Sequence, residues 1–234
     1  MEEDLLRNRL TQVRRETAEA AAQAGYPAPK IIAVTKTHPA EMILPLLDMD
    51  QADIGENRVQ EIVEKLPALD GKFRIHLIGR LQSNKVKYII EHVCLIHSVD
   101  RLSLAEEIDR QAQKHDLVMP VLMQISPAGE PQKGGVAPEE AENLLRQMAK
   151  LPGLKVRGLM AVMPKTEDET WLSGLFAQTR TLFERLRDEG IPGVEMEELS
   201  MGMSGDYQIA ARHGATMVRI GSALFGPRDY GLKV

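Results

Sequence analysis

Apolar and polar residues follow two different periods along this chain, and the two periods alternate from residue 31 onward. Short runs of apolar, often β-branched residues predict strands buried on both faces, and apolar residues three and four positions apart predict helices. The predicted strands are Ile31–Lys36, Ala52–Asn57, Phe73–Gly79, Val93–Asp100, Val121–Ser126, Val156–Met163, Glu198–Met203 and Met217–Gly221. The predicted helices between them are Ala40–Leu47, Arg58–Leu66, Asn84–Glu91, Arg101–His115, Pro138–Lys150, Glu167–Glu189 and Tyr207–His213.

This alternation is typical of parallel βαβ units, in which each helix crosses the sheet between two strands. Eight such strands in a chain of 234 residues fit a (β/α)8 TIM barrel, which takes about 250 residues. An open, doubly wound sheet is the alternative, because a sequence does not show whether a sheet closes. Since no linker, charge block or low-complexity segment divides the chain, we expect one domain over residues 1–234.

One further helix is predicted before the first strand. In Glu2–Gln23, Leu6 and Leu10 begin a pattern with helical spacing, and Gly25 and Pro27 then end it. We expect this extra N-terminal helix to cover one end of the domain.

The first strand, I-I-A-V-T-K, runs directly into a lysine. Because side chains alternate along a strand, Lys36 shares one face with Val34 and Ile32. Apolar surroundings disfavour the charged form of a lysine, and a neutral amine condenses with an aldehyde or ketone to form a Schiff base. The alternative is a lysine whose amine simply reaches solvent from the end of the strand.

In a barrel, the active site lies where the strands end and the βα loops begin. Polar residues and glycines gather at these positions, although each is also typical of a turn or a helix cap, as Ser204 would be for the seventh helix. Their positions therefore support the fold more than the function. The strand ends are Lys36, Asn57, Gly79–Lys85, Ser98–Asp100, Ser126, Met163–Pro164, Ser200–Ser204 and Arg219–Ser222.

The last two strand ends predict a phosphate site, since barrels often hold phosphate in the loops after strands seven and eight and at a short extra helix. Gly221 and Ser222 precede room for about one helical turn. Ser200 and Gly202 offer a hydroxyl and a close backbone approach from the neighbouring strand. The alternative is a Gly-Ser turn that binds nothing. Strands one and eight are neighbours in a closed barrel, so a phosphorylated carbonyl compound would reach both this site and Lys36.

Arg219 lies in the eighth strand and shares a face with Met217 and Gly221. An arginine inside a barrel needs a partner, because an unpaired buried charge is strongly destabilising. Its partner is either a structural carboxylate, such as Asp53 or Glu56, or an acceptor on a bound ligand.

The composition excludes several other classes of function. The chain is 43% hydrophobic and 27% charged, with a net charge of −5 and both signs interspersed, so neither a nucleic-acid nor a membrane partner is expected. The six histidines and the single Cys94 show no metal-binding spacing. His76 either faces the site or is a core histidine, and the core position is favoured. We interpret Cys94 as a buried thiol. The acidic N-terminus has no apolar segment of a signal peptide, so a cytoplasmic location is expected.

Specific motifs spread over nearly the whole chain resemble the pyridoxal phosphate homeostasis protein family. They are A-V-T-K at Ala33–Lys36, I-G-E-N-R-V-Q-E at Ile54–Glu61, H-L-I-G-R-L-Q-S-N-K at His76–Lys85, G-E-P-Q-K-G-G at Gly129–Gly135, L-S-M-G-M-S-G-D at Leu199–Asp206 and V-R-I-G-S-A-L-F-G at Val218–Gly226. The resemblance implies a barrel of PLP fold type III, related to the N-terminal domain of alanine racemase, that binds pyridoxal 5'-phosphate (PLP).

The same resemblance implies roles for individual residues. Lys36 would hold PLP as a covalent aldimine, Arg219 would face the pyridine nitrogen, and Asn57 would lie beside the cofactor. Around the phosphate group it implies Ser200, Gly221 and Ser222.

The sequence also departs from the racemase pattern. Racemases of this type have a second, β-rich domain that helps to complete a dimeric active site, whereas this chain ends at Val234, soon after the eighth strand. We therefore expect half of the racemase constellation and much of its lid to be absent, and we expect a monomer.

Two classes of function follow. The first is a PLP-binding protein that buffers or carries PLP in intracellular PLP homeostasis, affects amino-acid and keto-acid metabolism, and serves apo-PLP enzymes. The second is a PLP-dependent amino-acid racemase of low activity, and a more distant one is a Schiff-base aldolase that uses Lys36 or Lys165. A permanently charged Arg219 disfavours protonation of the pyridine nitrogen and so weakens the cofactor as an electron sink. The carrier function is therefore favoured, with no efficient catalysis and no catalytic residue assigned.

Overall fold

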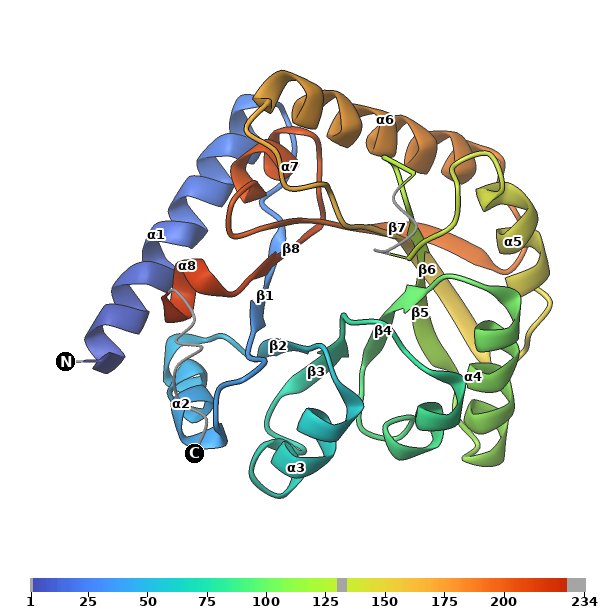
Figure 1. The fold of residues 1–234 in the computed structure, drawn as a ribbon, viewed down its shortest axis with the longest axis horizontal. Helices are drawn as coiled ribbons and strands as arrows, with labels where there is room; N and C mark the ends of the chain where they lie inside the picture. The colour runs from blue at the N-terminus through green and yellow to red at the C-terminus, as the bar shows by residue number, and fades with distance from the viewer. Residues whose placement is uncertain (1, 130–133, 227–234) are drawn as a thin grey trace.

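The computed structural model describes residues 2–129 and 134–226 of the chain. Eight parallel strands close into a barrel in chain order, and the helices form a ring around it (Figure 1). The predicted (β/α)8 barrel is confirmed and the open sheet is excluded, because β1 pairs with both β2 and β8. The strands are β1 (Lys30–Val34), β2 (Asp53–Glu56), β3 (Arg74–Leu77), β4 (Leu95–Val99), β5 (Met119–Ile125), β6 (Leu154–Ala161), β7 (Val194–Met203) and β8 (Met217–Ile220).

Helices occur at every predicted position, but two of them are partly or wholly 3-10 helix. The stretch Ala40–Leu47 divides into α2 and η1, because Pro45 has no N–H to continue the α-helical hydrogen bonds. The stretch Asn84–Glu91 contains only the short 3-10 helix η2. The helices are α1 (Glu2–Gln23), α2 (Ala40–Ile43), η1 (Leu44–Met49), α3 (Val59–Leu69), η2 (Ser83–Tyr88), α4 (Leu102–Lys114), α5 (Ala141–Met148), α6 (Glu169–Asp188), α7 (Tyr207–Arg212) and α8 (Ser222–Phe225).

The N-terminal helix α1 lies in the outer ring, packed against α7 and α8, and not across an end of the barrel as expected (Figure 1). The reason is the short α8, which has four residues and leaves the side of β8 and β1 to be covered. Leu6, Leu10 and Val13 of α1 are buried there. None of the described helices is long and apolar enough to cross a membrane.

The core has two layers, which the alternation along β1 separates. Ile31 and Ala33 face the layer between the strands and the helices, whereas Ile32 points into the barrel. Apolar side chains fill only part of the barrel interior; the rest of it holds buried polar groups and, at the carboxyl end of the strands, a cavity. The apolar residues of the interior are Ile32, Leu95, Leu122, Met160 and Met217.

Candidate functional site

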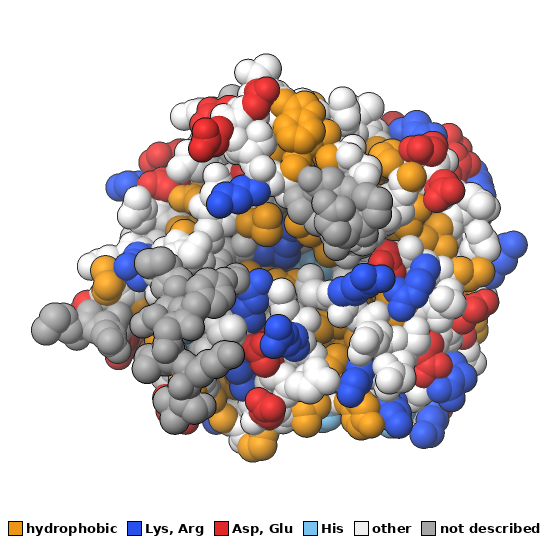
Figure 2. Space-filling model, in the orientation of Figure 1, with side chains coloured by type: hydrophobic (Ala, Val, Ile, Leu, Met, Phe, Trp, Pro, Cys, Tyr) orange, Lys and Arg blue, Asp and Glu red, His pale blue; other side chains and the backbone are white. Residues whose placement is uncertain are grey.

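A cavity of about 810 Å³ opens at the carboxyl end of the barrel strands, where barrel proteins place their sites. In the orientation of Figure 1, the surface is hollowed over the centre of the barrel, and Lys and Arg side chains gather around the hollow (Figure 2). This positive surround favours an anionic ligand. Five of the six predicted binding residues line the cavity, namely Lys36, Asn57, Arg219, Gly221 and Ser222.

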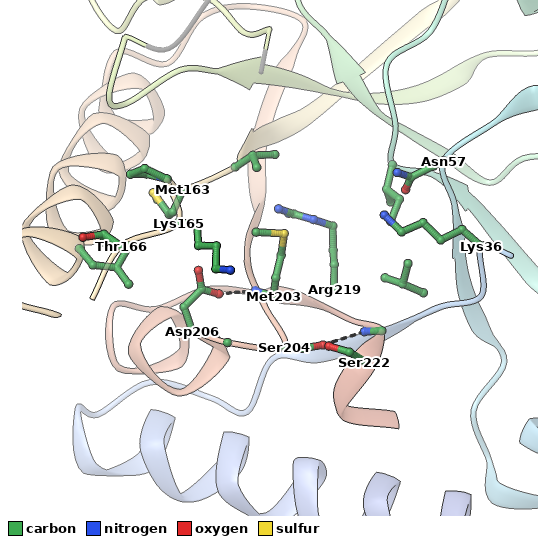
Figure 3. Close-up of a pocket in the computed structure, with 17 residues that line it drawn as sticks. Lys36, Asn57, Met163, Lys165, Thr166, Met203, Ser204, Asp206, Arg219 and Ser222 are labelled. Carbon is green, nitrogen blue, oxygen red and sulfur yellow. Dashed lines mark hydrogen bonds between the residues drawn. The ribbon is translucent and has the colours of Figure 1, made fainter. Parts of the chain in front are cut away.

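Lys36 follows β1, and its side chain extends into the cavity beside Asn57 (Figure 3). Hydrogen bonds fix the backbone on both sides of it. The Thr35 hydroxyl donates to Glu56 Oε1 at 2.6 Å, and the Thr37 backbone N–H donates to Glu61 Oε2 at 2.7 Å. Thr37 has φ of 68°, in the left-handed region that non-glycine residues rarely adopt. The turn that aims Lys36 is therefore held by one side chain from the end of β2 and one from α3.

A buried ion pair stands behind this turn. Lys65 Nζ lies 2.7 Å from Glu56 Oε1, and it also donates to the Thr35 carbonyl at 3.0 Å. Burial raises the pKa of Glu56, although Lys65 opposes the shift, and Glu56 Oε2 has no hydrogen-bond partner among the described residues. Sequence reasoning missed the role of this pair. Its signal is a carboxylate, Glu56, at the carboxyl end of the second predicted strand.

Asn57 reaches the cavity from the end of β2, and close packing with the next strand end fixes its backbone. A Cβ atom at Gly79 would lie 2.3 Å from the Asn57 carbonyl oxygen. Only glycine therefore fits at this point of the loop after β3. The resulting approach keeps Asn57 on the same side of the cavity as Lys36 (Figure 3).

The loops after β7 and β8 meet at Ser204. Its Oγ accepts hydrogen bonds from the backbone N–H groups of Gly221 at 3.0 Å and of Ala223 at 3.2 Å. Ser204 was considered as an N-cap of the seventh helix, but Asp206 precedes that helix and Ser204 instead joins the start of α8. Together with Gly221 and Ser222 it forms a small polar corner of the cavity, which we call the anion corner.

Arg219 lies in the middle of the cavity, with Lys36 on one side and Lys165 on the other (Figure 3). Its side chain is buried, and its Nη1 donates to the Ser200 carbonyl at 2.8 Å and to Ser200 Oγ at 2.7 Å. Its Nη2 donates to the Ala161 carbonyl at 2.7 Å. Burial lowers the pKa of Arg219 to about 10, and the charge of Asp206 opposes the shift. Arg219 is therefore charged at neutral pH and fixed in position.

The structural carboxylates that were considered as partners of Arg219 have other partners. Asp53 accepts hydrogen bonds from Arg74 and His76, and Glu56 pairs with Lys65. That alternative is wrong, because both carboxylates lie toward the other end or the outer side of the barrel wall. An acceptor on a ligand is the alternative that remains.

Ser200 is brought to Arg219 but not to the cavity. It is fully buried, and its hydroxyl lies 3.0 Å from His97 Nδ1 as well as 2.7 Å from the guanidinium. The pairing of β7 with β8 shifts register between Ser200 and Met203, and Gly202 has φ of 93°. Strict alternation therefore fails at this strand end, and Ser204 reaches the cavity where Ser200 was expected.

The wall opposite Lys36 carries Lys165 and Asp206 (Figure 3). Burial raises the pKa of Asp206, and the backbone N–H of Met203, which donates to its Oδ1 at 2.5 Å, opposes that shift. Sequence reasoning assigned nothing to Asp206. Its signal was the polar loop after the seventh predicted strand.

Among the described residues, no group of three or more His, Cys, Asp or Glu side chains is placed to hold a metal ion. The motif at Gly129–Gly135 lies partly outside the described residues. Cys94 is half-buried, and burial raises the pKa of its thiol to about 12, so the thiolate is scarce at neutral pH.

The fold and the lysine-bearing cavity define a barrel of the alanine racemase N-terminal type, and the family model "Alanine racemase, N-terminal domain" matches residues 9–229. A pyridoxal phosphate homeostasis protein of Aquifex aeolicus (strain VF5) is 42% identical over 225 residues, which are 95% of this chain and 98% of that protein. One of Pasteurella multocida (strain Pm70) is 39% identical over 94% of this chain and 97% of that protein. The chain belongs to the pyridoxal phosphate homeostasis protein family.

A solved structure extends the comparison to three dimensions. PipY of Synechococcus elongatus PCC7942, with PLP bound, superposes with a TM-score of 0.83 at 35% identity, covering 94% of this chain and 100% of that chain.

Proposed function

We propose that this protein binds PLP in the cavity above Arg219 and buffers or carries the cofactor in intracellular PLP homeostasis, thereby affecting amino-acid and keto-acid metabolism. The observation that carries the proposal is the lining of one cavity by an amine, a buried guanidinium and the anion corner. The PLP bound to PipY and the names of the relatives support the choice of PLP among phosphorylated carbonyl compounds.

Each residue has a role in this proposal. Lys36 forms a Schiff base with the aldehyde of PLP, and Asn57 lies beside the ring. Ser204, Gly221 and Ser222 surround the phosphate group: the two serines donate hydrogen bonds to it, and Gly221, whose N–H is held by Ser204, leaves it room. Because phosphate is an anion, hydrogen bonds from hydroxyl and backbone N–H groups to it are charge-assisted and strong.

Arg219 supplies a donor to the pyridine nitrogen. A guanidinium has five N–H groups; Nη1 uses two and Nη2 uses one in bonds to Ser200 and Ala161. Within the described part of the chain, Nε–H and the second Nη2–H are left for a ligand. Since arginine holds its own protons, the pyridine nitrogen accepts a hydrogen bond and stays unprotonated. PLP in that form is a weak electron sink, which favours carriage over catalysis.

A PLP-dependent racemase of low activity is the second candidate, and Lys165 and Asp206 favour it. Racemisation needs two bases on opposite faces of the substrate, and these two residues line the wall opposite Lys36. The Schiff-base aldolase is not retained, because the relatives from Aquifex aeolicus and Pasteurella multocida are pyridoxal phosphate homeostasis proteins.

We infer that residues 1–234 form one PLP-binding domain and that the protein is a cytoplasmic monomer. Its partners are PLP and apo-PLP enzymes, and it binds neither nucleic acid nor membranes. The net charge of −5 with both signs interspersed supports the absence of a nucleic-acid partner.

Borohydride reduction tests the function. The protein is loaded with PLP, reduced, digested and mapped by mass spectrometry, with Lys36→Ala and Lys165→Ala as a matched pair. We expect the reduced adduct on Lys36 in the wild type and in Lys165→Ala, and none at the site in Lys36→Ala. An adduct on Lys165 in the wild type, or none at either lysine, would overturn the assignment.

A further inference from the structure

A line of hydrogen-bonded side chains runs through the barrel interior, from Arg219 at the cavity to the first residue of β2. Ser200 Oγ lies 2.7 Å from Arg219 Nη1 and 3.0 Å from His97 Nδ1. His97 Nε2 lies 2.9 Å from His76 Nδ1, and His76 Nε2 lies 3.0 Å from Asp53 Oδ1. None of the five residues is more than 5% exposed. Such a line is costly to bury and is tolerated only when every member is satisfied.

Its far end is an ionised carboxylate. Burial alone would raise the pKa of Asp53, but hydrogen bonds from His76 and Arg74 outweigh burial and hold that pKa well below its usual range. Arg74 Nε donates to Asp53 Oδ1 at 2.8 Å, at the amino end of the barrel. A carboxylate only accepts hydrogen bonds, so His76 must donate to it from Nε2.

The remaining protons follow by elimination. When His76 carries one proton, held at Nε2 by Asp53, its Nδ1 accepts, so His97 donates to it from Nε2. Burial is the largest cause that lowers the pKa of His97 well below 6.5, and the charges of Arg219 and Lys30 act in the same direction, so His97 is neutral and accepts at Nδ1. The hydroxyl of Ser200 therefore donates to His97, and its oxygen accepts from Arg219. Every hydrogen bond in the line points from the guanidinium toward the carboxylate.

We propose that Ser200, His97, His76 and Asp53 form a positioning relay that orients the Arg219 guanidinium toward the ligand. The relay fixes Nη1, so the N–H groups left on Nε and Nη2 face the cavity in one orientation. Aligned hydrogen bonds polarise one another, which couples the buried positive charge to a carboxylate that it does not touch. The inference deepens and rests on the proposed function, since the ring nitrogen of PLP is the acceptor to which Arg219 is presented.

Nitrogen NMR of the histidine rings tests the relay in the wild-type protein without any ligand. We expect His76 and His97 both to be neutral and both to carry the proton on Nε2. An Nδ1-protonated or doubly protonated His97 would break the order of donors and overturn the relay. This measurement does not depend on PLP binding, so it separates the relay from the proposed function.

Two substitutions at one position test what the relay does. In His97→Asn, the amide oxygen takes the place of Nδ1 and still accepts from Ser200. In His97→Gln, the amide takes the place of Nε2, and Ser200 loses its acceptor. We expect His97→Gln to lower the affinity for PLP about tenfold, as for loss of one charge-assisted hydrogen bond, and His97→Asn to lower it less. Leu122→Met, a buried interior change outside the relay, is the control and should change affinity less than twofold.

A PLP analogue with carbon in place of the ring nitrogen, 1-deaza-PLP, separates positioning from a general loss of packing. Its affinity should be the same in the wild type and in His97→Gln, because it offers Arg219 no acceptor. Equal losses with PLP and with 1-deaza-PLP would mean that His97 is merely structural, and the relay would be rejected. If the wild type bound neither compound, the proposed function would fail. The relay would then be judged by the ring tautomers and by the hydrogen exchange of the Arg219 guanidinium, which should be faster in His97→Gln.

Discussion

Two cations on opposite surfaces of the barrel wall, the half-buried Lys65 and the buried Arg219, are held in different ways. Lys65, outside the wall, lies 2.7 Å from Glu56 Oε1 and 3.6 Å from Glu61 Oε2. Arg219, inside the barrel, makes its hydrogen bonds to two carbonyl oxygens and one hydroxyl, and to no carboxylate of the described residues. The charge of Lys65 is neutralised within the protein, whereas that of Arg219 is left to act on whatever enters the cavity.

Breaking the neutralised pair should have the largest effect on stability. Glu56→Ala leaves Lys65 buried without its main counter-charge, and we expect a loss of about 3–5 kcal/mol in the free energy of unfolding. Lys65→Met should lose less, because the raised pKa of Glu56 makes the protonated carboxyl tolerable. Urea denaturation of both variants measures the difference. Losses below about 1 kcal/mol in both variants would mean that the pair contributes little.

The sequence alone predicts some parts of the site and not others. Lys36, Asn57, Gly221 and Ser222 are predictable because each lies at or just after the end of a predicted strand, and the fold brings all strand ends to one rim. Their positions follow from the strand ends visible in the sequence and from the rule that barrel sites lie at the carboxyl ends of the strands. The barrel is predictable for a similar reason, because the alternation of strands and helices follows from the local spacing of apolar residues.

Positions that depend on register or on distant partners were not predictable. The end of the seventh predicted strand and the family resemblance predict Ser200 at the phosphate, but the irregular pairing of β7 with β8 brings Ser204 to the cavity instead. The partners of Ser200 lie in β4 and β8, and His97 is 103 residues away in the chain. No spacing in one sequence encodes such a contact, so the sequence only favours a core position for His76.

A substitution in the anion corner should have the next largest effect, this time on the affinity for PLP, because the corner holds the anionic phosphate group. Gly221 has room for a small side chain in the protein itself, since its Cβ would lie 3.5 Å from Val34 Cβ, but a larger one would enter the cavity. We expect Gly221→Val to weaken PLP binding about 100-fold, as for loss of two charge-assisted hydrogen bonds, and to weaken pyridoxal binding much less. Gly174→Ala, with nothing within 4 Å of its added Cβ, is the control. Equal losses for both ligands would place the phosphate group elsewhere.

Removing the other cation should affect binding more than folding. Arg219→Met takes away a buried charge and fills similar volume, so the change in unfolding free energy should stay within about 1–2 kcal/mol. PLP affinity should fall about tenfold through loss of the ring contact. Calorimetry of binding beside urea denaturation compares this variant with Glu56→Ala. A large loss of stability with unchanged affinity would reverse the contrast between the two cations.

The burial of His97 predicts a dependence of stability on pH. Burial, followed by the charges of Arg219 and Lys30, lowers the pKa of His97 well below 6.5, so below pH 6.5 the unfolded chain takes up a proton that the folded chain does not. The unfolded state then binds more protons, and stability falls as pH is lowered, by up to about 1.4 kcal/mol per pH unit for this group. Urea denaturation between pH 7 and pH 5 should give this slope in the wild type and a smaller one in His97→Asn. An unchanged slope in the variant would assign the effect to other groups, such as His213, whose pKa is also lowered by burial.

The smallest expected effect is on the α-proton of an amino acid, because a permanently charged Arg219 keeps the ring nitrogen of PLP unprotonated and the cofactor weak as an electron sink. The wild-type protein, loaded with PLP and incubated with D- and L-amino acids in deuterated water, should exchange a negligible amount of α-hydrogen, measured by NMR. Arg219→Glu places a carboxylate at the ring nitrogen and should raise the exchange wherever PLP is still bound, which the absorption spectrum reports. Asp206→Asn should leave the exchange unchanged if the cavity only carries PLP, and should lower it if Asp206 is a second base. Turnover by the wild type at ordinary enzyme rates, on the order of 10 s⁻¹, together with its loss in Asp206→Asn, would make the racemase the better description of this cavity.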